Sequence, residues 1–343
     1  MEASNLALFW AGVIALSILM YVILDGFDLG VGILFGFTRD TTNRQQMLNT
    51  IAPFWDGNET WLVIIGASLF AAFPTVYVVF LGAFYIPVLL MLFGLIFRGI
   101  AFEFRQRTER MGWLWDKGFF IGSTVVAFVQ GAAIGAMMRG IPVVNGHFAG
   151  HTFGWVHPFP ILTGVGLVLG YALLGAGWIV YKSEGELRDW AYAWIPRLVI
   201  AVFVVLALAY TVAMTFDAGA IAQGNVRARG WGVVFPILAI AALIGVVVSA
   251  RARRDALPFH LTALFFLAAY LTLGVMFWPY MVPYSLTVAS AAAPDASLGF
   301  FFFGGMIVLP MILIYTMGVY RVFRGKRHLG YSGRDDPLGR TPR

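Results

Sequence analysis

Long apolar stretches recur along the whole chain and constrain its fold more than any other feature. A helix that crosses a bilayer needs about 20 predominantly apolar residues. Nine stretches meet this requirement, at residues 6–37, 52–73, 76–101, 117–139, 159–181, 196–215, 231–250, 259–280 and 300–323. Only 12% of the chain is charged, about half the share in soluble domains. The pattern predicts an all-α polytopic membrane protein with nine transmembrane helices, and the net charge of +6 does not indicate nucleic-acid binding.

The basic residues are distributed unevenly between the connections, and this predicts the orientation. With nine spans, the odd-numbered connections and the C-terminal tail share one side, which carries 19 of the 23 Lys and Arg residues. Three lie on the other side, and Arg98 lies within a span. Because cytoplasmic loops accumulate Lys and Arg, we expect the N-terminus outside and the C-terminus in the cytoplasm. Residues 1–324 then form one membrane domain, and residues 325–343 form a basic cytoplasmic tail that contacts anionic lipid.

Five ionisable side chains interrupt the first three expected spans. Asp25 and Asp28 lie three residues apart in the inner half of the first span, on one helix face. Asp56 and Glu59 repeat that spacing at the start of the second span, and Arg98 lies near the cytoplasmic end of the third. An ionisable group near the bilayer centre costs about 2.5–3.5 kcal/mol. The cluster predicts a route for protons from the cytoplasm, made of carboxyl groups that exchange protons and one positive counter-charge.

Simpler interpretations remain open for three of these residues. Asp56 in the first turn of a helix would cap backbone N–H groups and complement the helix dipole, and Glu59 would complete the same capping arrangement. Arg98 would extend its side chain to the cytoplasmic headgroups. Asp25 and Asp28 are harder to explain in this way, because both lie well inside a long span.

The histidines do not indicate a haem or metal site. His147 and His151 lie four residues apart in an outer connection, with His157 nearby, and no neighbouring carboxylate or Cys completes a metal site. His260 begins the eighth span, and His328 lies in the tail. Because none lies in the middle of a span, where a helix bundle would hold an axial ligand, we expect the chain to ligate no haem.

Small residues recur on one part of the first span. Gly26 and Gly30 are separated by four residues, and so are Gly32 and Gly36. Small residues at this spacing let two membrane helices approach closely. The pattern predicts a tight helix–helix contact on this face.

Two segments near the N-terminus resemble subunit II of the cytochrome bd-type quinol oxidases. They are DGFDLGVG at residues 25–32 and IAPFWDGNETW at residues 51–61. Further matches are Leu69 to Pro74, Phe97-Arg98, Trp115-Asp116 and Trp278-Pro279 through Pro283. The resemblance extends over essentially the whole chain. It implies nine spans arranged as two four-helix bundles plus one peripheral helix, with the N-terminus outside.

The resemblance also implies a function. Such a complex in the bacterial cytoplasmic (inner) membrane oxidises membrane quinol and reduces O₂ to water in aerobic respiration. Its subunit I holds haem b and haem d and forms a heterodimer with this chain, which ligates no cofactor. The resemblance leaves room for a quinone, as a structural or substrate lipid, and for a small single-span subunit. The short outer connections agree with a compact member, such as those of the cyanide-insensitive subgroup.

The resemblance assigns roles to particular residues as well. The proton path proposed for the family uses carboxylates that match Asp28 and Asp56 here, and an arginine that matches Arg98. Asp25 belongs to the same motif. Glu59 is less secure as a relay, because some members carry an amide at this position.

The main alternative is a proton-coupled secondary transporter, which nine spans with buried carboxylates also fit. Many transporters consist of inverted repeats with broken helices at matching positions. No such repeat is visible in the sequence, and the acidic cluster is confined to its first third. A purely structural scaffold is a third alternative, and the same cluster argues against it.

Overall fold

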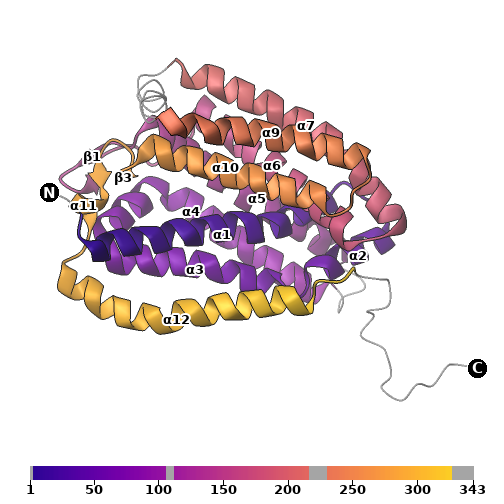
Figure 1. Cartoon of the computed structure of the whole chain (residues 1–343), viewed down its shortest axis with the longest axis horizontal. Helices are drawn as coiled ribbons and strands as arrows, with labels where there is room; N and C mark the ends of the chain where they lie inside the picture. The colour runs from indigo at the N-terminus through magenta and orange to yellow at the C-terminus, as the bar shows by residue number, and fades with distance from the viewer. Residues whose placement is uncertain (1–2, 106–111, 216–229, 327–343) are drawn as a thin grey trace, which may run out of the picture.

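The computed structural model describes residues 3–105, 112–215 and 230–326. Within these ranges, long helices run side by side along the longest axis of the molecule (Figure 1). They are α1 (Asn5–Phe35), α3 (Trp55–Ala72), α4 (Pro74–Phe104), α5 (Gly112–Arg139), α6 (Pro158–Lys182), α7 (Gly185–Ala213), α9 (Val234–Arg251), α10 (Leu257–Phe277) and α12 (Asp295–Val322). The shorter elements are α2 (Thr41–Ile51), α11 (Val288–Ala291), the 3₁₀ helix η1 (Gly230–Val233), and the antiparallel pairs β1 (Val143–Val144) with β2 (His147–Phe148) and β3 (Tyr280–Val282) with β4 (Leu286–Thr287).

The helices form two groups of four with α12 outside them. In the first group α1, α3, α4 and α5 pack on one another, and in the second α6, α7, α9 and α10 do so. Contacts of α6 with α1 and α5 join the two groups. α12 lies along the edge of the molecule against α3 and α1 (Figure 1). This arrangement agrees with the two bundles and peripheral helix that the resemblance implied.

Eight of the described helices are long and apolar enough to cross a membrane, which confirms the expected all-α polytopic class. The expected second span, 52–73, corresponds to α3, which is not among the eight. Its first turns carry Asp56, Asn58 and Glu59, which lower its apolar character. Because α3 packs along α1 inside the first group, it remains our ninth span. The count of nine and the orientation stay predictions.

Several boundaries differ from those expected. The first connection contains α2, which the apolar pattern did not indicate, because α2 lacks a long apolar run. The sixth span was expected to begin at 196, but α7 begins at Gly185 and continues through Pro196. The last was expected at 300, but α12 begins at Asp295. The apolar pattern finds the membrane-embedded part of a helix and misses the polar turns that extend it.

The described residues test only part of what was expected of the basic tail and of the basic residues in the connections. Lys326, at the start of the expected tail, pairs with Asp255 at 2.6 Å in the connection between α9 and α10. That residue is therefore bound to the protein, where free contact with lipid was expected. Outside the described ranges lie residues 327–343, which include His328, and four loop arginines, Arg107, Arg110, Arg227 and Arg229.

Glycines set the distance between the two groups of helices. A Cβ atom on Gly30 of α1 would lie 1.8 Å from the backbone oxygen of Tyr171, and one on Gly175 of α6 would lie 2.3 Å from the carbonyl carbon of Gly30. Only glycine permits this backbone contact between α1 and α6. On the same helix, a Cβ on Gly32 would lie 2.1 Å from Ser123 Oγ of α5. The tight contact expected from the glycine spacing is confirmed.

Candidate functional site

Arg98 of α4 lies among acidic side chains from two other helices. Its Nη1 atom lies 2.8 Å from Asp25 Oδ1 and 3.0 Å from Glu59 Oε1, and its Nη2 atom lies 3.9 Å from Asp28 Oδ2. The Arg98 side chain is 1% exposed and both aspartates are 0% exposed, whereas Glu59 is 24% exposed. We call these four residues the Arg98 cluster. The interpretation of Arg98 as reaching for lipid headgroups is wrong, because its guanidinium points into the bundle.

The sequence brings these residues together through helix geometry. The two aspartates lie three residues apart, so α1 presents both on one face. A close contact between α4 and α5 occurs one turn before Arg98. A Cβ on Gly122 would lie 2.6 Å from the Gly94 oxygen and 3.4 Å from the Arg98 nitrogen. This contact draws α4 into the first group, so that the long Arg98 side chain reaches α1 and α3.

Asp56 does not join the Arg98 cluster. It is exposed in the first turn of α3, whose N-cap residue is Phe54, and no side chain caps this helix end. Side-chain capping by Asp56 is therefore wrong, although its charge still complements the helix dipole. The capping interpretation of Glu59 is also wrong, because this residue lies more than one turn into the helix and pairs with Arg98.

Asn58 is a member of the site that sequence reasoning missed. Its Nδ2 donates to Asp28 Oδ2 at 2.7 Å and to the Leu24 oxygen at 3.1 Å. Its Oδ1 accepts from the Tyr320 hydroxyl of α12 at 3.1 Å. The signal was present in the sequence, because Asn58 stands between Asp56 and Glu59. A search for charged residues within spans does not find it, because its amide is neutral.

A second polar branch approaches the cluster from α5 and α6. The Tyr171 hydroxyl donates to Gln130 Oε1 at 3.0 Å, and Gln130 Nε2 donates to the Tyr21 hydroxyl at 2.9 Å. Tyr21 lies one turn before Asp25 on the same face of α1. These three residues were also missed. No feature of the sequence links them, because the contact depends on how α1, α5 and α6 pack.

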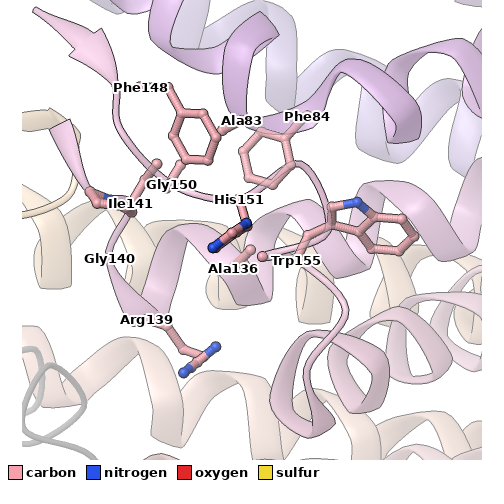
Figure 2. Close-up of a pocket in the computed structure, with 12 residues that line it drawn as sticks. Ala83, Phe84, Ala136, Arg139, Gly140, Ile141, Phe148, Gly150, His151 and Trp155 are labelled. Carbon is pink, nitrogen blue, oxygen red and sulfur yellow. The ribbon is translucent and has the colours of Figure 1, made fainter.

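A cavity lies at the other end of the bundle, where α4 and α5 meet β2 and the chain that follows it. It measures about 80 Å³, and Phe84, Arg139, His151 and Trp155 are among its lining residues (Figure 2). His151 is exposed, as expected for an outer connection. Among the described residues, no group of three His, Cys, Asp or Glu side chains lies close enough to hold a metal ion.

The fold and the site together define a class of protein. The chain is a multi-pass helical membrane protein whose interior holds one arginine among three carboxyl groups. It matches the model of the family described as cytochrome bd terminal oxidase subunit II over residues 6–323. The chain belongs to this family, and it is a multi-pass protein of the bacterial inner membrane.

Individual relatives agree with this family. The chain is 33% identical to cytochrome bd-I ubiquinol oxidase subunit 2 of Escherichia coli (strain K12), with 91% of this chain and 92% of the relative covered. It is 30% identical to cytochrome bd ubiquinol oxidase subunit 2 of Bacillus subtilis (strain 168), covering 92% and 95%. Its fold resembles a chain of the solved bd oxidase from Geobacillus thermodenitrificans, with a TM-score of 0.75, 15% identity and coverage of 93% and 99%.

Proposed function

We propose that this chain serves a complex that oxidises membrane quinol and reduces O₂ to water in aerobic respiration. Its membership of the cytochrome bd terminal oxidase subunit II family supports this proposal, as do two relatives named as ubiquinol oxidase subunits. The family also argues against the secondary transporter. The substrates are a quinol and O₂, and the reaction takes place in the complete complex.

The family implies a complex that contains haem, and the histidines in the described part of this chain do not fit the role of haem ligand. Among the described histidines, His147 and His151 belong to an outer connection, His157 precedes α6 and His260 lies in the first turn of α10. None points into the middle of a bundle, where an axial ligand would be needed. We therefore assign haem b and haem d to subunit I. In this proposal, subunit II forms a heterodimer with subunit I and stabilises it.

Within that complex, the Arg98 cluster takes up protons from the cytoplasm. The observation that carries this proposal is the charge balance: one guanidinium faces three carboxyl groups, and the two aspartates are fully buried. Three ionised carboxylates against one arginine would leave two uncompensated negative charges in a site whose two aspartates are shielded from water, which is costly. The cluster is therefore suited to hold and exchange protons.

The carboxyl groups also form a gradient of burial. Asp56 is exposed, Glu59 is 24% exposed, and Asp25 and Asp28 are completely buried. Asp56 and Glu59 lie three residues apart on one face of α3. We propose that protons reach Glu59 by way of Asp56 and pass from there to the buried cluster.

The test replaces Asp28 by Asn in the intact oxidase, which removes a titratable group and keeps its size. We expect a complex with normal haem absorbance whose O₂ consumption and proton uptake fall at least about tenfold, the effect of about 1.4 kcal/mol on a barrier. The matched control is Glu103→Gln on α4, because Glu103 is exposed. Wild-type turnover and proton uptake in Asp28→Asn would overturn the proposal.

A further inference from the structure

A buried lysine at the end of α6 is bonded to the end of α12. Lys182 lies in the last turn of α6 and is 3% exposed. Its Nζ donates to the Phe323 oxygen at 2.8 Å and to the Gly325 oxygen at 3.4 Å. Phe323 is the C-cap residue of α12. The carbonyl groups at a helix C-terminus carry partial negative charge, so a cation at this place stabilises the helix end.

Three aromatic rings surround the Lys182 ammonium. Its nitrogen lies 5.0 Å from the ring centroids of Trp178 and Tyr181 and 5.7 Å from that of Phe54. The faces of aromatic rings attract a cation at these distances, and the attraction is stronger where water is excluded. Two of the rings belong to α6 and the third to the N-cap residue of α3. The lysine therefore joins the end of α12 to both helices.

The last turn of α12 also carries a member of the candidate site. The Tyr320 ring lies 4.6 Å from the Phe54 ring, centroid to centroid. Its hydroxyl donates to Asn58 Oδ1 at 3.1 Å, and Asn58 Nδ2 donates to Asp28 Oδ2 at 2.7 Å. Because the amide oxygen accepts from Tyr320, the amide nitrogen is left to donate to Asp28. Direct contacts thus lead from the end of α12 to the Arg98 cluster.

α12 is a peripheral helix whose position depends strongly on its two ends (Figure 1). Only Leu298, Gly305 and Thr316 of its 28 residues are buried. At its first turns, Trp10 of α1 donates from Nε1 to the Leu298 oxygen at 3.3 Å. At its last turn, the bonds from Lys182 take this part.

A small cavity lies between α3 and α12 beside the candidate site. Asn58, Thr316 and Tyr320 are among its lining residues, and it measures about 10 Å³, which is room for about one water molecule. An outward movement of α12 would widen this cavity and take the Tyr320 hydroxyl away from the Asn58 amide.

We propose that Lys182 is a positioning residue that holds the C-terminal end of α12 in place. The position of α12 keeps the Tyr320 hydroxyl on Asn58, and the Asn58 amide is thereby kept on Asp28. Lys182 itself takes no part in proton transfer. This inference rests on the proposed role of the Arg98 cluster in proton uptake.

The first test measures the attachment of α12 by hydrogen exchange of backbone amides in the intact oxidase. Lys182→Met keeps a long apolar side chain and removes the charge and the N–H donors. The Phe323 amide donates to the Val319 oxygen at 3.0 Å. A hydrogen bond from a charged group is worth about tenfold or more in an equilibrium, so we expect amides of this last turn to exchange about tenfold faster. Lys182→Arg keeps a cation with N–H donors and should exchange more slowly than Lys182→Met.

The matched control is Lys326→Gln. Lys326 follows the same helix and pairs with Asp255 at the surface, where an ion pair contributes little. We expect exchange in the last turn of α12 to change by less than about twofold in this variant, and O₂ consumption to stay at the wild-type rate.

The second test measures turnover and separates positioning from general stability. Tyr320→Phe removes the hydroxyl that donates to Asn58, and we expect O₂ consumption to fall about fivefold, the effect of one hydrogen bond. Lys182→Met should lower it by a similar factor while haem absorbance stays normal. Because Lys182 acts through Tyr320, the double variant should be no slower than the slower single variant.

The outcomes distinguish this inference from the function it rests on. Unchanged exchange in Lys182→Met would overturn the attachment. Wild-type turnover in Lys182→Met or Tyr320→Phe, or losses that multiply in the double variant, would overturn the positioning role. Any of these together with slow turnover in Asp28→Asn would leave proton uptake standing, whereas wild-type turnover in Asp28→Asn would overturn the proposed function itself.

A milder variant keeps the test decisive if Lys182→Met does not assemble. Tyr181→Leu removes one ring from around the ammonium and leaves the lysine in place. We expect faster exchange at the end of α12 and slower O₂ consumption, both by about twofold to fivefold, the effect of one cation–π contact. Wild-type values of both quantities in this variant would overturn the proposal.

Discussion

Two ionic clusters lie toward the α2 end of the first helical group, and their charge balances are opposite. In the Arg98 cluster, one guanidinium serves three carboxyl groups, and both aspartates are fully buried. In the second cluster, Asp116 of α5 pairs with Arg44 at 2.6 Å and with Arg105 at 2.5 Å. We call these three residues the Asp116 cluster. Its side chains are 14–21% exposed.

The difference indicates what each cluster is suited to do. In the Asp116 cluster two arginines balance a single carboxylate, and the three residues tie α2, α4 and α5 together near the surface. Gln45 of α2 extends it by accepting from Arg105 at 2.9 Å. The Arg98 cluster has one positive charge for three carboxyl groups and its two aspartates are shielded from solvent, so its carboxyl groups gain from holding protons. We therefore expect the buried Arg98 cluster to be the one that exchanges protons. Replacements in the two clusters should affect different properties of the complex.

The largest effect is expected for Arg98→Leu. It removes the only positive charge from the cluster, and breaking a buried pair in this way costs about 3–5 kcal/mol. We expect loss of assembly, measured as haem absorbance per purified complex. Adding Asp28→Asn should recover assembly in part while turnover stays slow. Arg105→Leu is the matched control in the Asp116 cluster and should assemble. Strictly additive losses in the two single variants and the double variant would show that Arg98 and Asp28 are not coupled.

The next effect concerns the two carboxyl groups of α3. Glu59→Gln removes a partner of Arg98, and we expect turnover to fall about tenfold with assembly intact. Asp56→Asn removes an exposed charge, and we expect a smaller decrease, about twofold to threefold. O₂ consumption of the two purified variants measures both. A larger loss for Asp56→Asn than for Glu59→Gln would contradict the order given by burial.

An effect on stability, and not on turnover, is expected where α1 meets α6. Gly30→Ala places a Cβ 1.8 Å from a backbone oxygen of Tyr171, and overpacking of this kind costs about 1–3 kcal/mol. The midpoint of thermal unfolding of the complex should fall. Gly12→Ala on the same helix is the control, because no described atom lies within 4 Å of the added carbon. Equal midpoints for the two variants would show that the contact is not tight in the assembled protein.

The smallest effect is expected at the surface, where Asp255 pairs with Lys326. Burial opposes ionisation of Asp255, but hydrogen bonds from Lys326 and Tyr192 outweigh it and hold the pKa of Asp255 below its usual value. The pair therefore stabilises the folded protein at pH values above about 4, and this contribution is lost as the pH falls through the lowered pKa. Lys326→Gln should cost about 0.5 kcal/mol at pH 7 and nothing in strong acid. A cost that is independent of pH would contradict this assignment.

The sequence predicted the helices and the charged half of the site, for identifiable reasons. Apolar runs mark the membrane-embedded part of each helix, and buried charges such as Asp25, Asp28 and Arg98 stand out because they are expensive there. The apolar pattern missed α2, although a residue that can cap the start of this helix is present in the sequence. Asp40 caps it by accepting from the Thr42 and Asn43 nitrogens.

The uncharged members of the site were harder to predict. Asn58 lies within the motif at residues 51–61. A search for all polar residues in spans, and not only for charged ones, finds it. Tyr21, Gln130 and Tyr171 come from three helices separated by long stretches of chain, and nothing local marks them. Their contact depends on the close approach of α6 to Gly30 of α1. The glycine spacing predicted a tight helix contact on this face of α1, but it could not show which helix makes the contact.

We expect the Arg98 cluster to hold a proton at neutral pH, because its one guanidinium does not balance three carboxylates, two of which are fully buried. Infrared spectroscopy of the purified oxidase measures this directly, because protonated carboxyl groups absorb separately from carboxylates. We expect a protonated-carboxyl signal that is diminished in Asp28→Asn and unchanged in Asp116→Asn. A signal that Asp28→Asn leaves untouched, or one that disappears in Asp116→Asn, would contradict it.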